Sequence, residues 1–232
     1  MRLVWLTEYF EPPSAERRSE IRESIQANLA NPCFDSCHIF FAGDVAYLPQ
    51  WISTNSKART QPISSPLRFS DFLGFARDTR VIYVLTNADI KLDASASLLR
   101  YVNERELWAL SRWNDGVKPP FIHRCTQDTW ALRGSRIPAS LVAQCDFTLG
   151  VPGCDNAFAG RLREAGYKIL NYSWSIRTDH LHAAQSRNYL HNKPVERPYF
   201  FPAPSRAPLP IRLSDWLRKS FLFSGRREAE PA

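Results

Sequence analysis

The fold is decided by one stretch of this 232-residue chain, RVIYVLTNADI at residues 80–90. Its first seven residues form a strongly apolar, β-prone run, which predicts a strand buried at the centre of a parallel sheet. Polar side chains follow at once, at Asn87 and Asp89. In open α/β folds, ligands bind in the crevice at the carboxyl ends of such strands. The stretch therefore predicts the middle of the sheet and one wall of a ligand site.

The segments before this strand alternate between strand and helix. Residues 3–7 are apolar and predict a first buried strand. Ser14 can cap a helix whose apolar residues recur every four positions, and Asn31-Pro32 ends it. Residues 38–42 predict a second strand. This order is typical of an α/β layer fold with right-handed connections and mainly parallel strands.

The rest of the main domain continues the same pattern. We expect helices at 69–76, led by Ser70, at 94–103 and at 155–165, and strands at 107–111, 129–133 and 168–170. Gly166 is a good stop for the helix at 155–165. Residues 48–66, rich in Ser, Thr, Pro and Gln, and residues 113–127 are expected as loops. The predicted fold class is therefore α/β, with a mixed, mainly parallel sheet and helices on both faces.

The last part of the chain differs from the rest. Six prolines crowd residues 194–210, which excludes regular structure there and indicates a linker or a wrapping arm. Leu213, Trp216 and Leu217 then recur at helical spacing among basic residues. We therefore divide the chain into a domain at 1–193 and a tail at 194–232. The tail contains a basic amphipathic helix, for which there are two interpretations. It lies on an anionic membrane surface through residues 211–227, or it packs on its own domain or on a partner chain.

Composition and charge limit the function classes. The chain is 44% hydrophobic, which is ordinary for a globular core, and its apolar runs are far shorter than the roughly 20 residues of a membrane span. The net charge of +7 attracts anionic partners, but the Lys and Arg residues form no stripes interleaved with aromatics, so nucleic acid is not an expected partner. We expect a cytoplasmic protein, with the tail as a candidate for peripheral attachment at the inner face of the membrane.

Several acidic residues stand where chemistry is expected. Asp89 follows the central strand, and a divalent cation bridging to a phosphate is one use for it. Asp128 lies in a Gln-Asp-Thr-Trp box, and Asp155 opens a helix just after the tight Gly150-Val151-Pro152-Gly153 turn. His180 and His182 come later, and one of them could point at a metal. The alternative for the acids is that they cap helices and make turns.

The order of these motifs resembles that of GT-A-type glycosyltransferases, and more closely that of a group of uncharacterised bacterial glycosyltransferase-like proteins. The residues that carry the resemblance, which covers about residues 1–190, are Asn87-Ala88-Asp89-Ile90, Leu110-Ser111-Arg112-Trp113, Gln127-Asp128-Thr129-Trp130, Gly150-Val151-Pro152-Gly153-Cys154-Asp155-Asn156, Gly166-Tyr167-Lys168-Ile169 and His180-Leu181-His182 followed by Arg187-Asn188-Tyr189. The resemblance implies a GT-A-like, Rossmann-like fold for residues 1–193.

The resemblance also implies a metal site. Asp89 would hold a Mn²⁺ or Mg²⁺ ion that neutralises the diphosphate of a nucleotide-sugar donor. His180 would complete the metal shell, with His182 as its substitute if the register differs. Asn87 stands where a first aspartate is usual. A neutral amide gives the cation less charge, so either metal binding is looser or the site is metal-independent.

Roles for the other residues follow from the same resemblance. Asp155 would be the catalytic base that deprotonates the acceptor hydroxyl, with Asp128 as a rival for that role or as an acceptor-binding residue. The remaining candidates are donor-binding. Thr7, Glu8 and Tyr9, in a loop after the first strand, would lie against the nucleotide base. Arg17, Arg18 and Arg112 would contact the phosphates, and Trp113 is a further donor-binding candidate. The alternative for each arginine is a solvated surface ion pair.

The implied activity is transfer of a sugar from a nucleotide-sugar donor to a hydroxyl acceptor, a glycan or a lipid-linked molecule, as in polysaccharide biosynthesis. Two alternatives use the same residues. One is a metal-dependent nucleotidyltransferase or phosphohydrolase. The other is a catalytically degenerate protein that binds a nucleotide or a glycan without turnover, an alternative suggested by Asn87.

Overall fold

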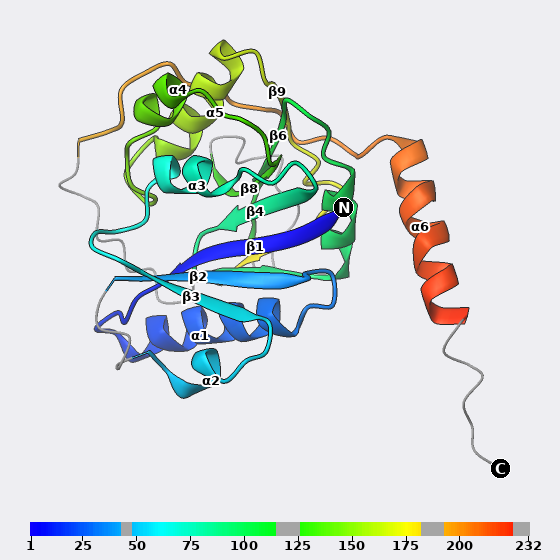
Figure 1. Ribbon diagram of the computed structural model, residues 1–232, viewed down its shortest axis with the longest axis horizontal. Helices are drawn as coiled ribbons and strands as arrows, with labels where there is room; N and C mark the ends of the chain where they lie inside the picture. Colours follow the sequence, from blue (N-terminus) through cyan, green and yellow to red (C-terminus); the bar gives the residue numbers. More distant parts are fainter. Residues whose placement is uncertain (43–47, 115–125, 182–192, 225–232) are drawn as a thin grey trace.

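A seven-stranded sheet runs through the middle of the protein (Figure 1). The computed structural model describes residues 1–42, 48–114, 126–181 and 193–224, with side chains to residue 219. The strand order is β3 (Ala58–Ile63), β2 (Ser36–Ala42), β1 (Arg2–Tyr9), β4 (Val81–Thr86), β8 (Gln127–Arg133), β6 (Glu106–Ser111) and β9 (Lys168–Leu170). All neighbouring pairs are parallel except those that β8 makes with β4 and β6. The prediction of a mixed, mainly parallel sheet with β4 at its centre is confirmed.

Helices cover both faces of this sheet, as predicted. Helices α1 (Ala15–Ala30) and α2 (Gln50–Ser53) lie on one face, and α3 (Phe69–Phe75), α4 (Ala139–Gln144) and α5 (Cys154–Glu164) lie on the other (Figure 1). Each face has its own hydrophobic core, and β4 contributes to both because its side chains alternate. Ile82 and Val84 pack on the α1 side, whereas Tyr83 and Leu85 pack on the α3 and α5 side.

Local signals set the ends of the helices that carry site residues. The Ser14 hydroxyl accepts a hydrogen bond from the Arg17 backbone N–H (3.3 Å), which caps α1 as predicted. Helix α5 starts after Gly153, whose φ of 76° lies in the left-handed region that glycine adopts without strain. Gly166, with φ 83°, ends the same helix as expected. Asp155 therefore sits in the first turn of α5.

A second, three-stranded sheet brings a late segment back to the end of β4. It consists of β5 (Ile90–Leu92), β10 (Thr178–His180) and β7 (Trp113–Asn114), with β10 in the middle. The Thr178 hydroxyl donates to the Ser111 carbonyl oxygen (2.9 Å), which ties β10 to the end of β6. The sequence predicts no strand at residues 178–180. Instead, His180 is part of a strand, because pairing with β5 and β7 compensates for its polar sequence.

Other predicted boundaries need correction. Residues 48–66 are not a loop, since they contain α2 and β3. Strand β3 was missed because it is an edge strand with exposed polar side chains, held by its hydrogen-bond ladder to β2 rather than by burial. Helix α3 starts at Phe69 as predicted, but Ser70 does not cap it, because the N-cap residue is Arg68, whose N–H donates to the Asp71 carboxylate (2.9 Å). Within the predicted loop 113–127, Trp113 and Asn114 form β7 and Gln127 opens β8, whereas residues 115–125 lie outside the described residues. The segment expected as a helix at 94–103 is the 3₁₀ helix η2 (Ala94–Tyr101).

The proline-rich arm has no helix or strand at residues 194–208, as expected, but the prediction is wrong for residues 209 and 210, which belong to a helix. Pro210 is compatible with the first turn of a helix, where its missing N–H would have no partner. The arm lies against α5 through backbone hydrogen bonds, including Phe200 N–H to the Asn156 carbonyl (3.0 Å). The arm leads into α6 (Leu209–Ser224), at the side of the molecule (Figure 1). Among the described residues, no helix has both the length and the apolar character that crossing a membrane requires.

Candidate active site

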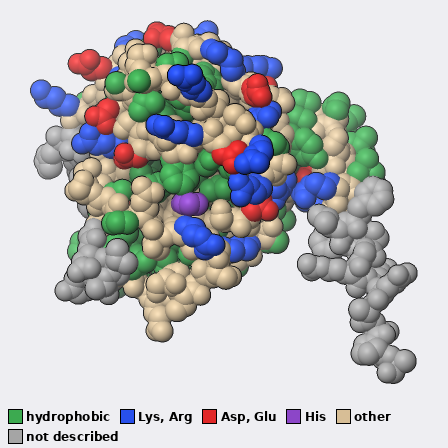
Figure 2. Space-filling view, viewed as in Figure 1, with side chains coloured by type: hydrophobic (Ala, Val, Ile, Leu, Met, Phe, Trp, Pro, Cys, Tyr) green, Lys and Arg blue, Asp and Glu red, His purple; other side chains and the backbone are tan. Residues whose placement is uncertain are grey.

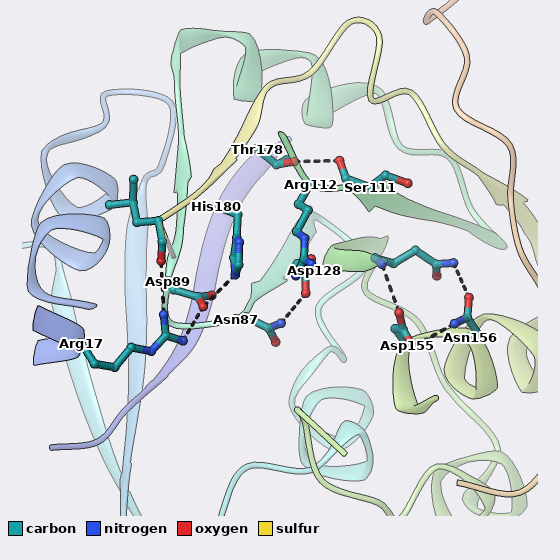
Figure 3. Close-up of polar contacts among 12 residues, drawn as sticks. Arg17, Asn87, Asp89, Ser111, Arg112, Asp128, Asp155, Asn156, Thr178 and His180 are labelled. Atoms are coloured by element: carbon teal, nitrogen blue, oxygen red, sulfur yellow. Dashed lines mark hydrogen bonds and ion pairs between the residues drawn. The ribbon is translucent and has the colours of Figure 1, made fainter. Parts of the chain in front are cut away.

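Polar side chains from several elements meet at the carboxyl end of β4 (Figure 3). They come from α1 (Arg17), the segment after β4 (Asn87, Asp89), the residue after β6 (Arg112), the start of β8 (Gln127, Asp128), the first turn of α5 (Asp155, Asn156) and β10 (His180). The antiparallel direction of β8 places its first residues beside the last residues of β4. The side chains form three groups, each centred on one aspartate.

The first group is centred on Asp89, which is 5% exposed. Its Oδ2 atom accepts from the Arg17 guanidinium and lies 3.1 Å from His180 Nε2. Burial alone would raise the pKa of Asp89, but the His180 contact and the Arg17 charge outweigh it and hold the pKa at about 2. The lowered pKa favours the ionised carboxylate, which can only accept hydrogen bonds.

Arg17 is held in place by more than Asp89. Its Nη1 atom donates to Glu20 (2.9 Å) and to the Leu181 carbonyl oxygen (3.2 Å). The Arg17 side chain is 16% exposed, and its neighbour Glu20 is largely buried too. The guanidinium thus bridges α1, the end of β4 and the end of β10. This arrangement fixes a positive charge beside Asp89 with little freedom to move.

The second group is centred on Asp128, which is 8% exposed. The Asn87 side-chain amide donates to Asp128 Oδ1 (2.6 Å), and the Asn87 backbone N–H donates to the Asp128 carbonyl (3.1 Å). Arg112 forms an ion pair with Oδ2 (3.5 Å). Burial raises the pKa of Asp128, against the charge of Arg112, and the nearby charge of Asp89 raises it further.

The third group is centred on Asp155, which is half-buried. The Gln127 backbone N–H donates to its Oδ2 atom (3.2 Å), and the Asn156 amide donates to Oδ1 (3.0 Å). The Gln127 side chain in turn donates to Asn156 (3.1 Å) and so orients that amide. Burial, together with the charge of Asp128, raises the pKa of Asp155 to about 6. A carboxylate with this pKa is suited to general-base work near neutral pH.

Two carboxylate oxygens remain without a hydrogen bond from the described residues. They are Asp89 Oδ1 and Asp128 Oδ2, the latter facing only the more distant Arg112. Buried polar atoms are usually satisfied by protein, water or ligand, so such atoms concentrated in one place indicate a polar ligand or ordered solvent. Both oxygens lie at the carboxyl end of β4, where the sequence analysis predicts a ligand site.

The described residues do not form a divalent-cation site. The structure brings the predicted pair Asp89 and His180 together. However, the Asp89 Oδ2 atom that contacts His180 also accepts a hydrogen bond from the positively charged Arg17 guanidinium. The amide of Asn87 is turned to Asp128. Within the described ranges, no three His, Cys, Asp or Glu side chains are grouped so that they could hold a metal ion. The predicted substitute His182 lies outside the described residues, as do Arg187, Asn188 and Tyr189.

Thr7, Glu8 and Tyr9 belong to β1 and not to a loop after it. The Thr7 hydroxyl donates to the Thr86 carbonyl (3.1 Å), and the Glu8 carboxylate accepts from the Leu67 N–H (3.1 Å). Burial raises the pKa of Glu8. Tyr9 packs in the core beside Phe41 and Trp51. All three are largely enclosed by the protein itself.

Arg18 and Trp113 make their hydrogen bonds outside the three aspartate groups. Arg18 donates to the Pro12 (3.0 Å) and Pro13 (2.9 Å) carbonyls and forms a surface ion pair with Glu11, the alternative stated for each arginine. The Trp113 indole N–H donates to the Ser173 carbonyl (2.9 Å), which anchors β7. Trp113 is half-buried, next in the chain to Arg112.

Sequence reasoning gave no role to Gln127, Asn156 or Glu20. Gln127 and Asn156 were quoted within motifs, but their contacts depend on β8 starting beside the first turn of α5. Glu20 had a local signal, since it follows Arg17 by three residues on a helix and such pairs are neighbours. These three residues position the charged side chains of the site.

The comparisons with known proteins support the fold. No protein-family profile matches the sequence, and no curated protein matches it. The structure is similar to the mannosyltransferase PcManGT from Pyrobaculum calidifontis, which was solved with GDP-Man and Mn²⁺ (TM-score 0.54, 12% identity, covering 81% of this chain and 58% of that one). It is also similar to S. aureus TarS (TM-score 0.50, 8% identity, covering 78% and 60%).

The chain spans about three fifths of the length of these two structures. At such low identity, the likeness concerns the arrangement of helices and strands. That arrangement is the one which the sequence motifs predict. The chain therefore has a GT-A-type fold, which it shares with PcManGT and TarS.

Proposed function

We propose that the protein transfers a sugar from a nucleotide-sugar donor to a hydroxyl group of a glycan or a lipid-linked acceptor. The observation that carries the proposal is Asp155, a half-buried carboxylate with a pKa raised to about 6. It lies at the carboxyl end of β4, in the same site as the groups centred on Asp89 and Asp128. The GT-A-type fold supports the reaction class by analogy, since one fold can host several chemistries.

The proposed chemistry is a single displacement. The acceptor hydroxyl oxygen attacks the anomeric carbon of the donor sugar, and the bond from that carbon to the diphosphate oxygen breaks. The hydroxyl proton passes to Asp155, and the electron pair of the broken bond stays on the diphosphate. Because the attack comes from the face opposite the leaving group, this step inverts the anomeric configuration. The hydrogen bonds from Gln127 and Asn156 hold the Asp155 carboxylate in one orientation for this step.

Two arginines are proposed to stabilise the leaving diphosphate. Arg17 and Arg112 are fixed beside Asp89 and Asp128, so their guanidinium groups need no reorganisation when charge develops. Guanidinium groups match phosphate oxygens in shape and charge. Since the described residues do not fit a divalent cation, we propose that donor binding is metal-independent. Of the two expectations for a neutral Asn87, looser metal binding or a metal-independent site, this is the second.

Calorimetry with UDP, GDP, CDP, TDP and their sugars tests the proposal, with each titration run in Mn²⁺ and in EDTA. We expect one nucleotide family to bind, with the same Kd in both buffers, and Arg17→Gln to weaken binding by about tenfold or more. Exposed Arg136→Gln, which removes the same charge, is the matched control. No binding to folded protein would sink the proposal. Binding that needs Mn²⁺ would overturn its metal-independent form.

Product analysis separates the proposal from its alternatives. A nucleotidyltransferase or phosphohydrolase would cleave the nucleotide without a sugar acceptor, and it would depend on a cation cluster that the described residues do not form. A degenerate binding protein would bind the donor without turnover. The Asn87 amide, which is committed to Asp128, is the observation that favours this version.

A further inference from the structure

Helix α6 exposes a row of large hydrophobic side chains. Leu209, Leu213, Trp216 and Leu217 are 65%, 52%, 62% and 43% exposed, and they follow one another at helical spacing on one side of the helix. Four of the seven large hydrophobic side chains that are exposed in the described part of the chain belong to this row, which we call the apolar ridge. Clustered exposure of this kind marks an interaction site, whereas scattered apolar residues do not.

The opposite side of α6 is fixed to the domain. Asp215 is 4% exposed and accepts from the Ser97 hydroxyl of η2 (2.7 Å). Lys219 (2.9 Å) and Arg218 (3.1 Å) pair with the same carboxylate, and Lys219 also donates to the Ala94 carbonyl. Packing on its own domain therefore accounts for one side of the helix. It also sets the rotation of α6, which keeps the apolar ridge turned outward.

Basic side chains border the apolar ridge. Arg206 and Arg212 are exposed, and together with Lys219 they line a cavity of about 330 Å³ beside Trp216 and Trp174. In the described part of the chain, no ion pair involves Arg206 or Arg212. Figure 2 shows the green hydrophobic side chains of α6 on the right of the molecule, with blue basic side chains where the helix meets the domain.

We propose that this face of α6 docks on an anionic membrane surface. Trp and Leu side chains on a helix lie favourably at the boundary between headgroups and acyl chains. Arg206 and Arg212, which form no ion pair among the described residues, would then face lipid phosphates. A second copy of the chain fits less well, because it would bring two surfaces with basic borders together, whereas an anionic membrane complements that charge.

This inference stands apart from the proposed transfer reaction, since it rests on α6 and not on the aspartate groups. The two can fail separately, because vesicle binding needs no nucleotide and nucleotide binding needs no membrane. If both hold, the protein would meet its acceptor at the membrane surface, which favours a lipid-linked hydroxyl over a free glycan.

Co-sedimentation with vesicles tests the proposal on the full chain. We expect binding to vesicles of equal parts phosphatidylcholine and phosphatidylglycerol, and little binding to phosphatidylcholine alone. The double variant R206Q/R212Q should weaken binding by about tenfold or more. The double variant L213Q/W216Q should weaken it by a similar factor, because it removes apolar surface from the ridge. Brominated phospholipid should quench tryptophan fluorescence in the wild type, and the quenching should drop in Trp216→Phe, which keeps most of the apolar surface.

The matched control is R136Q/K168Q, which removes two exposed positive charges elsewhere. We expect it to bind vesicles as the wild type does. Equal weakening in the control would overturn the proposal in favour of net-charge attraction. Binding that survives both α6 variants, or no binding to anionic vesicles, would also overturn it. So would a concentration-dependent dimer that L213Q/W216Q dissociates, since a second copy would then occupy the ridge.

Discussion

Asp155 combines three properties at one residue: partial exposure, a fixed orientation and a pKa raised to about 6. Asp155→Asn should lower kcat by about 10² to 10⁴-fold, because it removes the proposed proton acceptor but keeps the size of the side chain. Donor affinity should stay within about twofold of the wild type. Steady-state kinetics and calorimetry measure the two effects. Glu164→Gln, at the exposed end of the same helix, is the control and should leave kcat unchanged.

The raised pKa of Asp155 also predicts a pH dependence. A base must be deprotonated to act, so kcat/KM should rise with pH through about 6 and level off above it. Because the charge of Asp128 contributes to the raised pKa, Asp128→Asn should move the midpoint to lower pH. Rate profiles of both proteins check this. A wild-type profile without an ionisation near pH 6, or a midpoint that rises in Asp128→Asn, would contradict it.

Some residues of the candidate site could be predicted from the sequence, and others could not. Asp89 could be placed from the buried strand before it, and Asp155 from the glycine-rich turn before it, since both signals are local. The contact between Arg17 and Asp89 joins residues 72 positions apart, and no periodicity encodes it. Gln127 was missed because it binds Asp155 through its backbone N–H, which every residue except proline has.

At the scale of elements, the packing of the arm on α5 can be tested with glycine. A Cβ atom at Gly160, inside α5, would lie 2.2 Å from the Pro198 carbonyl oxygen. Gly160→Ala should therefore lower the free energy of unfolding by about 1–3 kcal/mol, because the arm must move. Urea denaturation measures the change.

Gly74, inside α3, provides the matched comparison, since a Cβ atom there meets nothing within 4 Å. Gly74→Ala should raise the free energy of unfolding by about 0.5–1 kcal/mol, because alanine loses less backbone entropy in a helix. If Gly160→Ala were as stable as Gly74→Ala, the arm would not rest on α5 in solution.

The elements that the sequence predicts best are those whose stability comes from burial. Helix α1 and strand β4 carry clear apolar patterns, and both lie where expected. The three residues of β10 are too few for a pattern, and they are polar although buried. Their pairing with β5 and β7 is a tertiary event, which propensity and periodicity do not record.

At the scale of the whole molecule, both hydrophobic cores share the strands of one sheet. Trp5 is buried in the core on the α1 side and Trp130 in the core on the α3 and α5 side. Neither core can form without the sheet, so we expect one cooperative unfolding transition. In the wild type, far-UV circular dichroism and tryptophan fluorescence should give the same unfolding midpoint. The two probes should also agree with each other in Trp130→Phe, in which the fluorescence no longer includes Trp130. Two separated midpoints would indicate that the cores unfold independently.

The two borders of the large sheet bear on how the protein behaves in concentrated solution. An open edge offers unpaired N–H and C=O groups to other chains and invites fibrous association. One border is β9, which is only three residues long. The other is β3, where Arg59 adds a charge and Pro62 has no N–H to donate. Both borders are therefore poor templates for a further strand. The seven-stranded sheet is in this way protected from pairing with the sheet edge of another molecule.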